Sequence, residues 1–142
     1  MPLSYYPAPG EIVVCHFDPG AKPPEMVKSR PVIVAGPRLR RRSELVTIVP
    51  LSTTPPDPVE PYHCRIELAH PLPRPFDNPV MWAKCDMIMS VSVQRLDRFK
   101  RPRDGRTGAR SWTTGRVDKL QLQQVRRAIL HGLGLGGLTS WL

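Results

Sequence analysis

The sequence contains no long hydrophobic run. Its last stretch, LHGLGLGGLTSWL, is too short and too rich in glycine to cross a bilayer as a helix, which takes about 20 apolar residues. The opening MPLSYYPAPG is rich in proline and lacks the apolar segment of a signal peptide. We therefore expect a cytoplasmic protein with no membrane segment.

Cysteine is scarce, with only Cys15, Cys64 and Cys85 in the chain. His16 follows Cys15 and His63 precedes Cys64, so a zinc site assembled across strands is conceivable. No CxxC or HExxH spacing supports one, and buried strand cysteines are the favoured alternative. We expect a reduced protein that uses no metal and no other cofactor.

Acidic residues are also few. Aspartate and glutamate number 12 against 21 lysines and arginines, which gives a formal charge of +9 and a pI near 10.2. Net charge alone leaves two interpretations open: a nucleic-acid partner, or a basic surface that only prevents association. The placement of the cations, in a turn over residues 38–42 and a late segment over residues 98–110, favours contact with a phosphate backbone.

Proline, by contrast, is abundant, and its 18 residues fall between the apolar runs. Because proline is tolerated mainly at strand ends and edges, this distribution predicts short strands joined by stiff loops. The strands are expected over residues 11–17, 31–36, 45–51, 62–68 and 80–93, the last as one bent strand or two. Residues 95–101 are expected to close the sheet, and residues 102–115 to form an exposed loop or hairpin.

A single helix is predicted at the end, from residue 117 to about 134. Apolar residues recur there at three- and four-residue steps, and these are Leu122, Val125, Ile129 and Leu133. Gly132 and Gly134 are expected to end the helix. The pattern predicts one mainly β domain over residues 1–142, a small half-open barrel with a C-terminal α-helix. Its parts are a barrel over about 10–100, a basic loop over about 101–116, the helix over about 117–134 and a short tail over 135–142.

Five pieces of sequence occur in an order that resembles the PemK/MazF toxins of type II toxin–antitoxin systems. They are PGEIVVCHFDP, a loop containing Glu25, SRPVIV, TIVPLSTT and AKCDMIMSVSVQRL, followed by the amphipathic helix. The resemblance covers Gly10 to about Leu135. It implies an SH3-like half-open barrel of the CcdB/PemK/MazF type that pairs as a homodimer. It also implies selective cleavage of single-stranded RNA, usually messenger RNA, and neutralisation by an antitoxin, which we expect to be acidic because this chain is basic.

Metal-independent RNA cleavage can use the substrate's 2′-hydroxyl as nucleophile, and it then needs an acid, a base and fixed cations or donors. The resemblance places the charge stabiliser at Arg30, whose extended backbone is favoured by Pro31. It places a phosphate donor at Thr53, with Ser52 and Thr54 beside it. STTPP is also good turn chemistry, so a purely structural role for these hydroxyls stays open.

The acid and the base are expected among Glu25, in the loop that the family places over the scissile phosphate, and Asp86, with Lys84 as its neighbouring cation. Some relatives carry a histidine just before the loop glutamate, where this chain has Pro24, and this departure argues against a histidine mechanism. A structural carboxylate paired with Lys84 or an arginine is the alternative for Asp86.

Contacts with the RNA backbone are expected from the basic runs, which we predict to lie beside the site loops. The residues are Lys28, Arg38, Arg40, Arg41, Arg42, Thr54, Arg103 and Arg106. Trp112 is expected either to stack on a base or to anchor its loop to the barrel.

Two other functions remain open from the sequence. One is a toxin of the same fold that binds a protein such as DNA gyrase, although a pure protein binder has no need of the phosphate site that Arg30 and Thr53 would form. The other is a basic RNA- or DNA-binding module without catalysis, which would bind in a salt-dependent way and cut nothing.

Overall fold

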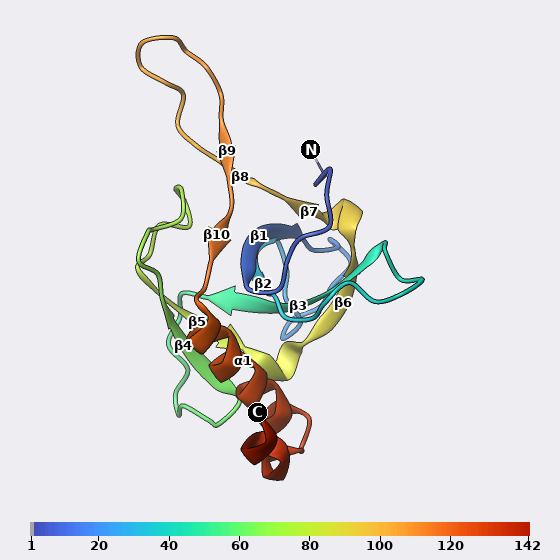
Figure 1. Ribbon diagram of the computed structural model, residues 1–142. Coiled ribbons are helices and arrows are strands. Elements are labelled where there is room, and N and C mark those ends of the chain that lie inside the picture. The colour runs from blue at the N-terminus through green and yellow to red at the C-terminus, as the bar shows by residue number, and fades with distance from the viewer. Residues whose placement is uncertain (1) are drawn as a thin grey trace.

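The computed structural model describes residues 2–142 and shows an open antiparallel sheet with one α-helix against it (Figure 1). The main sheet has the strand order β10-β1-β2-β3-β5-β4, with β7 paired to β1 and β6 paired to β3. Its strands are β1 (Glu11–His16), β2 (Ser29–Val34), β3 (Leu45–Ser52), β4 (His63–Glu67), β5 (Val80–Lys84), β6 (Met89–Ser92), β7 (Leu96–Asp97) and β10 (Gly115–Arg116). The predicted mainly β architecture with a C-terminal helix is confirmed.

Strand β3 pairs with neighbours along both edges. Val32, Ile33 and Val34 of β2 lie opposite residues 50, 49 and 48 on one edge. On the other edge the first half of β3 pairs with β6 and the last two residues pair with β5. The predicted segment 80–93 is therefore two strands, separated by the 3-10 turn η1 (Cys85–Met87). A further turn, η2 (Val93–Arg95), follows β6.

Two hydrophobic clusters lie on the two faces of this sheet. The first includes Ile33, Leu51 and Met81, and it is covered by α1 (Lys119–Gly132) through Val125 and Ile129. The second packs against the other side of β1, β2 and β3 and includes the fully buried side chains of Val13, Val32, Val46, Ile48 and Leu96. Alternate side chains of each strand thus enter different clusters, as the two-residue period of a strand requires.

The end of the chain differs from the prediction in several details. Asp118 caps α1 by accepting a hydrogen bond from the Gln121 amide at 2.7 Å, so the helix begins at Lys119 and not at residue 117. Leu133 lies beyond the last helical residue and is 55% exposed, so its predicted place on the buried face was wrong. The expected tail contains a 3-10 turn, η3 (Gly136–Trp141). Within residues 2–142 no helix has the length and apolar character needed to span a membrane.

The segment expected to close the sheet is divided. Residues 96–97 form β7 on the main sheet, whereas β8 (Phe99–Lys100) pairs with β9 (Trp112–Thr113) to form a separate two-stranded ribbon. Together with the loop between them, these strands project from the body as an arm (Figure 1). The predicted basic loop over 101–116 is therefore mostly an arm, and its last two residues, β10, return to pair with β1.

A buried carboxylate fixes the first residues of the chain to β1. Glu11 is 6% exposed and accepts hydrogen bonds from the Tyr5 hydroxyl and from the Ala8 amide at 3.1 Å. Burial, followed by the hydrogen bond and the negative charge of Glu11, raises the pKa of Tyr5 to about 12. The phenol is held in its neutral form because ionising it would place a second negative charge beside Glu11.

Gly132 allows the end of α1 to touch η1. A Cβ atom at this position would lie 2.9 Å from both the Asp86 Cα and the Cys85 carbonyl oxygen. Both are backbone atoms, so no change of rotamer could relieve the clash. The absence of a side chain therefore sets how closely the helix approaches the turn that carries Asp86.

We expect stability to depend on Tyr5 more at pH 9 than at pH 11. A folded-state pKa raised above the ordinary 10 contributes stability that is complete below about pH 10 and is lost as the pH rises through about 12. Denaturant unfolding of the natural protein and of Tyr5→Phe at both pH values measures this difference. An equal gap between the two proteins at pH 9 and 11 would contradict the proposed pairing of Tyr5 with Glu11.

We expect Gly132→Ala to destabilise the protein by about 1–3 kcal/mol, the usual cost of overpacking, despite the ~1 kcal/mol that alanine gains in helices. Gly137→Ala is the control, because a Cβ there meets nothing within 4 Å. Thermal unfolding compares the two variants. A Gly132→Ala protein as stable as the control would show that α1 and η1 can separate at little cost.

Candidate functional site

Arg30 lies at the second residue of β2, at the base of the loop that joins β1 to β2. Its Nε donates to the Val27 carbonyl oxygen at 3.0 Å, and its side chain is half-buried. Lys28 just before it has a φ of 66°, a left-handed turn that brings the loop into the strand. Pro31 is buried after it. Within residues 2–142 the terminal nitrogens of Arg30 have no hydrogen-bond or ion-pair partner, so their N–H groups are available to donate to an anion.

Arg30 and Ser52 lie on the same side of the sheet. Val32 pairs with Pro50, and Arg30 and Ser52 each lie two residues beyond that pair on their own strands, so their side chains point to the side that Val32 and Pro50 share. Ser52 is half-buried, whereas Thr53 and Thr54 after it are exposed. The Ser52 hydroxyl accepts a hydrogen bond from the Thr54 amide at 3.2 Å. Ser52 therefore has the structural role in the turn that the sequence left open for this segment. Its hydroxyl hydrogen is still available to donate to another group.

Strand β5 adds a cation to the same face. Ser52 pairs with Trp82, and Lys84 follows two residues later on the same side of β5. Lys84 in turn lies opposite His63 of β4. The alternate residues of these strands, such as Leu51 and Ala83, point into the first hydrophobic cluster. We call the half-buried polar set formed by Arg30, Ser52, Trp82 and Lys84 the β2–β3–β5 face.

Asp86 lies in η1, two residues beyond Lys84, and is exposed. No cation within the described residues lies within 4.0 Å of its carboxylate, so the structural ion pair that the sequence offered as an alternative is not formed. The close approach of Gly132 fixes the backbone of Asp86 from the helix side. Asp86 is thus an exposed carboxylate on a closely packed turn, two residues beyond Lys84 of the β2–β3–β5 face.

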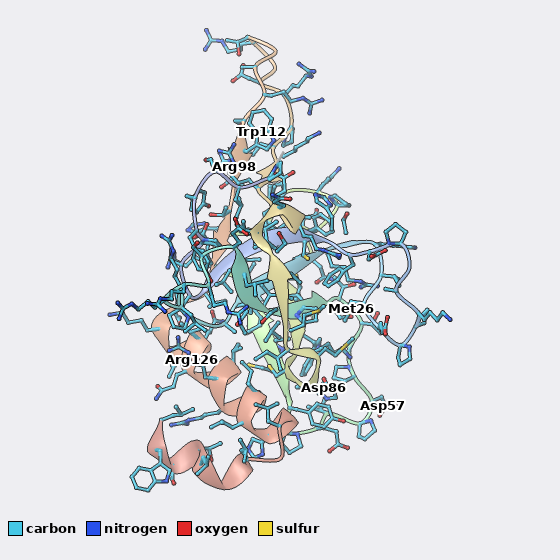
Figure 2. The ribbon with its side chains drawn as sticks, turned by 90° about the vertical axis from the view of Figure 1, so that its right-hand side faces the viewer. Met26, Asp57, Asp86, Arg98, Trp112 and Arg126 are labelled. Atoms are coloured by element: carbon cyan, nitrogen blue, oxygen red, sulfur yellow. The ribbon has the colours of Figure 1, made fainter. Side chains whose placement is uncertain are left out.

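Glu25 is exposed in the β1–β2 loop, where its carboxylate accepts a hydrogen bond from the Lys22 amide at 2.9 Å. It lines a cleft of about 560 Å³ whose other walls come from η1, β6 and η2. The apolar walls of this cleft include Met26, Met87 and Met89, and its cation is Arg95. Figure 2 shows Met26 and Asp86 on the same side of the molecule. The structure therefore brings the Glu25 loop and the η1 segment together.

Arg95 and the three methionines were missed by the sequence analysis. The prediction of one bent strand or two over residues 80–93 did not include the 3-10 turns η1 and η2, which bring Met87 and Arg95 to the cleft. Arg95 holds the Asp18 carboxylate at 3.7 Å and keeps 41% of its side chain exposed. No local sequence signal marks these residues, because their role arises from the turns.

The basic turn is placed differently from our expectation. Arg38, Arg40, Arg41 and Arg42 are all exposed, but they lie in the connection between the last residue of β2 and the first of β3. Arg30 and Ser52 lie at the opposite end of this pair of strands. The eight residues of β3 span roughly 25 Å at ~3.3 Å per residue, so the turn is not beside the site loops. Arg38 instead lies over the Tyr6 ring at 5.6 Å.

Arg103 and Arg106 lie in the exposed loop at the end of the arm. Arg103 donates to the Gly108 carbonyl oxygen at 3.1 Å, which shapes the loop. Trp112 is 40% exposed, and the Arg98 guanidinium lies over its ring at 5.6 Å (Figure 2). This tryptophan therefore packs within the arm, while part of its surface stays accessible.

The cysteines are structural, as the sequence favoured. Cys15, Cys64 and Cys85 are all buried and unpaired. Burial raises the pKa of all three thiols, that of Cys15 to about 11. They therefore remain protonated and unreactive near neutral pH.

The fold matches solved structures of small bacterial ribonucleases and toxins. An endoribonuclease from a mycobacterial species has a TM-score of 0.60 at 18% identity over 92% of this chain and 93% of that one. The Mycobacterium tuberculosis toxin MazF-mt6 has a TM-score of 0.59 at 19% identity, over 87% and 96%. MazF from Deinococcus radiodurans has a TM-score of 0.58 at 20% identity, over 92% and 99%. These likenesses define the MazF class of fold.

The family follows from the sequence itself. Residues 8–133 match the model of the PemK-like, MazF-like toxins of type II toxin–antitoxin systems, and the chain belongs to that family. An uncharacterised Escherichia coli K12 protein, YifN, is 31% identical, with 70% of this chain and 78% of that one aligned. The predicted resemblance is confirmed.

Proposed function

We propose that this protein is a metal-independent endoribonuclease toxin that cuts single-stranded RNA, messenger RNA in particular. The observation that carries the proposal is the β2–β3–β5 face, where an arginine whose terminal nitrogens have no partner among residues 2–142 shares one side of the sheet with a hydroxyl and a lysine. Cations and neutral donors held on a rigid sheet suit an anion whose charge grows during the reaction. Family membership and the names of the structural neighbours support RNA as the substrate.

The chemistry requires attack of the RNA 2′-hydroxyl on the adjacent phosphorus. The bond to the 5′-oxygen breaks, and the products are a cyclic phosphate and a 5′-hydroxyl. Arg30 would stabilise the phosphoryl oxygens with its two free nitrogens, because guanidinium binds them in a fork. Thr53 and Ser52 would donate to the same group. DNA would not be cut, because it lacks the 2′-hydroxyl.

Proton transfer is assigned to Asp86 and Glu25, with Lys84 as the nearby cation. Asp86 has no competing partner among the described residues, whereas Glu25 already accepts a hydrogen bond within its own loop. Asp86 is therefore our first candidate for the group that moves a proton, and Glu25 for the group that shapes the loop over the RNA. Lys28 and Thr54, at the two edges of the site, would contact the neighbouring phosphates.

The remaining cations would bind RNA farther from the cut. Arg38, Arg40, Arg41 and Arg42 form one exposed patch, and Arg103 and Arg106 form another at the end of the arm. We further propose a homodimer and an acidic antitoxin that covers the basic surface, since the family belongs to type II toxin–antitoxin systems. Light scattering of the purified protein tests the homodimer.

We expect Arg30→Ala to lower the cleavage rate by about two to three orders of magnitude, the usual loss for one fixed charge stabiliser. The assay incubates long single-stranded RNA with excess EDTA and maps the fragment ends. Arg126→Ala is the control, because it removes the same charge from α1 (Figure 2), which packs on the first hydrophobic cluster and so on the other side of the sheet from Arg30. Full activity of a folded Arg30→Ala protein, with unchanged products, would refute the assignment. Intact RNA with the natural protein would favour a non-catalytic binder or a protein-directed toxin.

We expect Asp86→Asn to lower the rate at least about 100-fold, the lower range for loss of an acid or base, and Glu25→Gln to lower it less than about tenfold. The glutamine amide oxygen can still accept the bond from the Lys22 amide that Glu25 accepts now. Single-turnover rates between pH 5 and pH 9 compare the two variants. The reverse order of effects would make Glu25 the group that transfers the proton.

A further inference from the structure

The arm is strongly positive. Together with the residues that flank it, the segment 98–116 contains seven lysines and arginines and one aspartate, a net charge of +6. The single carboxylate, Asp104, accepts hydrogen bonds from the Arg106 and Thr107 amides at 2.7 and 2.9 Å. Those bonds shape the tip of the loop and hold the pKa of Asp104 below its usual value. The arm is therefore an ordered, strongly positive projection.

A cleft of about 290 Å³ lies at the base of the arm. Its cations are Arg98 and Lys100 from the arm side and Arg74 from the β4–β5 loop, and its aromatic walls are Phe76 and Phe99. Those two rings meet edge to face with centroids 5.7 Å apart, which keeps the wall rigid. Lys100 has no ion-pair partner within residues 2–142. The cleft thus combines a free cation with an apolar wall, and it is distinct from the methionine-lined cleft near Glu25.

The lining of this cleft also includes the polar pair His16 and Ser29. His16 Nδ1 lies 2.7 Å from the Ser29 hydroxyl, and its Nε2 lies 3.7 Å from the Asp97 carboxylate. The ring is therefore oriented on both sides. An anion would avoid Asp97 and occupy the arm side of the cleft, among Arg74, Arg98 and Lys100. The His16–Ser29 side can exchange hydrogen bonds with a neutral polar group.

A nucleotide unit of RNA has these properties: one phosphate, a ribose hydroxyl and a base with a flat face and polar edge. The volume, at the lower end for small-ligand pockets, suits a single such unit. Ser29 faces this cleft, whereas its neighbour Arg30 points to the opposite side of β2. A strand of RNA leaving the proposed cutting site could therefore pass the end of β2 and enter the cleft.

We propose that the cleft at the base of the arm binds one nucleotide of the RNA substrate outside the scissile bond, and that the arm guides the strand that follows. Lys100, Arg98 and Arg74 hold the phosphate, and His16 and Ser29 contact the ribose or base. The inference rests on the proposed function in taking RNA as the substrate. It adds a binding site on the opposite side of β2 from Arg30.

The test measures binding of a fluorescent single-stranded 2′-O-methyl RNA to the full chain by anisotropy, in EDTA and at several salt concentrations. This probe lacks the free 2′-hydroxyl and is not cut. Lys100→Gln and Arg74→Gln are each expected to raise the Kd about three- to tenfold and to reduce the salt slope by about 0.7. Arg126→Gln, the matched control on α1, is expected to leave both near the natural values. His16→Ala is expected to raise the Kd with a smaller change in the salt slope than Lys100→Gln, because His16 is placed at the ribose or base and not at the phosphate.

Three results would overturn the inference. One is natural affinity in Lys100→Gln and Arg74→Gln. Another is an equal loss in Arg126→Gln, which would show that only net charge matters. The third is competition by polyglutamate as effective as competition by RNA at equal charge, which would indicate an acidic protein as the occupant. A cleavage assay separates this inference from the proposed function. If the protein binds RNA through Lys100 but cuts no RNA, the proposed ribonuclease activity is refuted and the nucleotide-binding cleft is retained.

Discussion

Strand β3 forms hydrogen bonds along both edges, and the positions of the other strands depend on this sharing. One edge is taken by β2, and the other is divided between β6 and β5. The division requires the chain to turn at η1, between β5 and β6, and η1 is where Asp86 lies. It also pairs the last two residues of β3 with β5, just beyond the residue at which β3 stops pairing with β2. The arrangement of Arg30, Ser52 and Lys84 is thus a consequence of strand pairing more than of contacts among those side chains.

Most strands could be predicted from the sequence because they are short runs of apolar and β-branched residues, as in residues 45–49. The helix was also predictable, because Val125 and Ile129 recur at helical spacing. Leu133 was misplaced because the same spacing continues past Gly132, which is the last residue of the helix. The break in residues 80–93 and the pairing of β10 with β1 carry no local signal. Both arise from long-range pairing that only the folded sheet specifies.

The candidate site was partly predictable for a different reason. Arg30, Ser52 and Lys84 occur in motifs that resemble a known family, and the alternation of side chains along β2, β3 and β5 puts them on one side of the sheet, while their roles stay a prediction. The separation of the Arg38–Arg42 turn from that face could not be predicted, since charge runs do not reveal which end of a hairpin they occupy. The cleft formed by His16, Arg74 and Lys100 joins residues from three distant segments. No spacing rule detects such a combination.

The three buried thiols have a practical consequence for studies of the arm. Because the pKa of each is raised and each side chain lies in a hydrophobic cluster, the native cysteines should react slowly with maleimides near neutral pH. A cysteine introduced at the exposed Ser111 would then be the single fast-reacting site, without prior removal of the natural ones. A spin label or fluorophore attached there would report the motion of the arm in solution. Because the native thiols are buried in the packing around the sheet, they do not compete with a surface cysteine for the label.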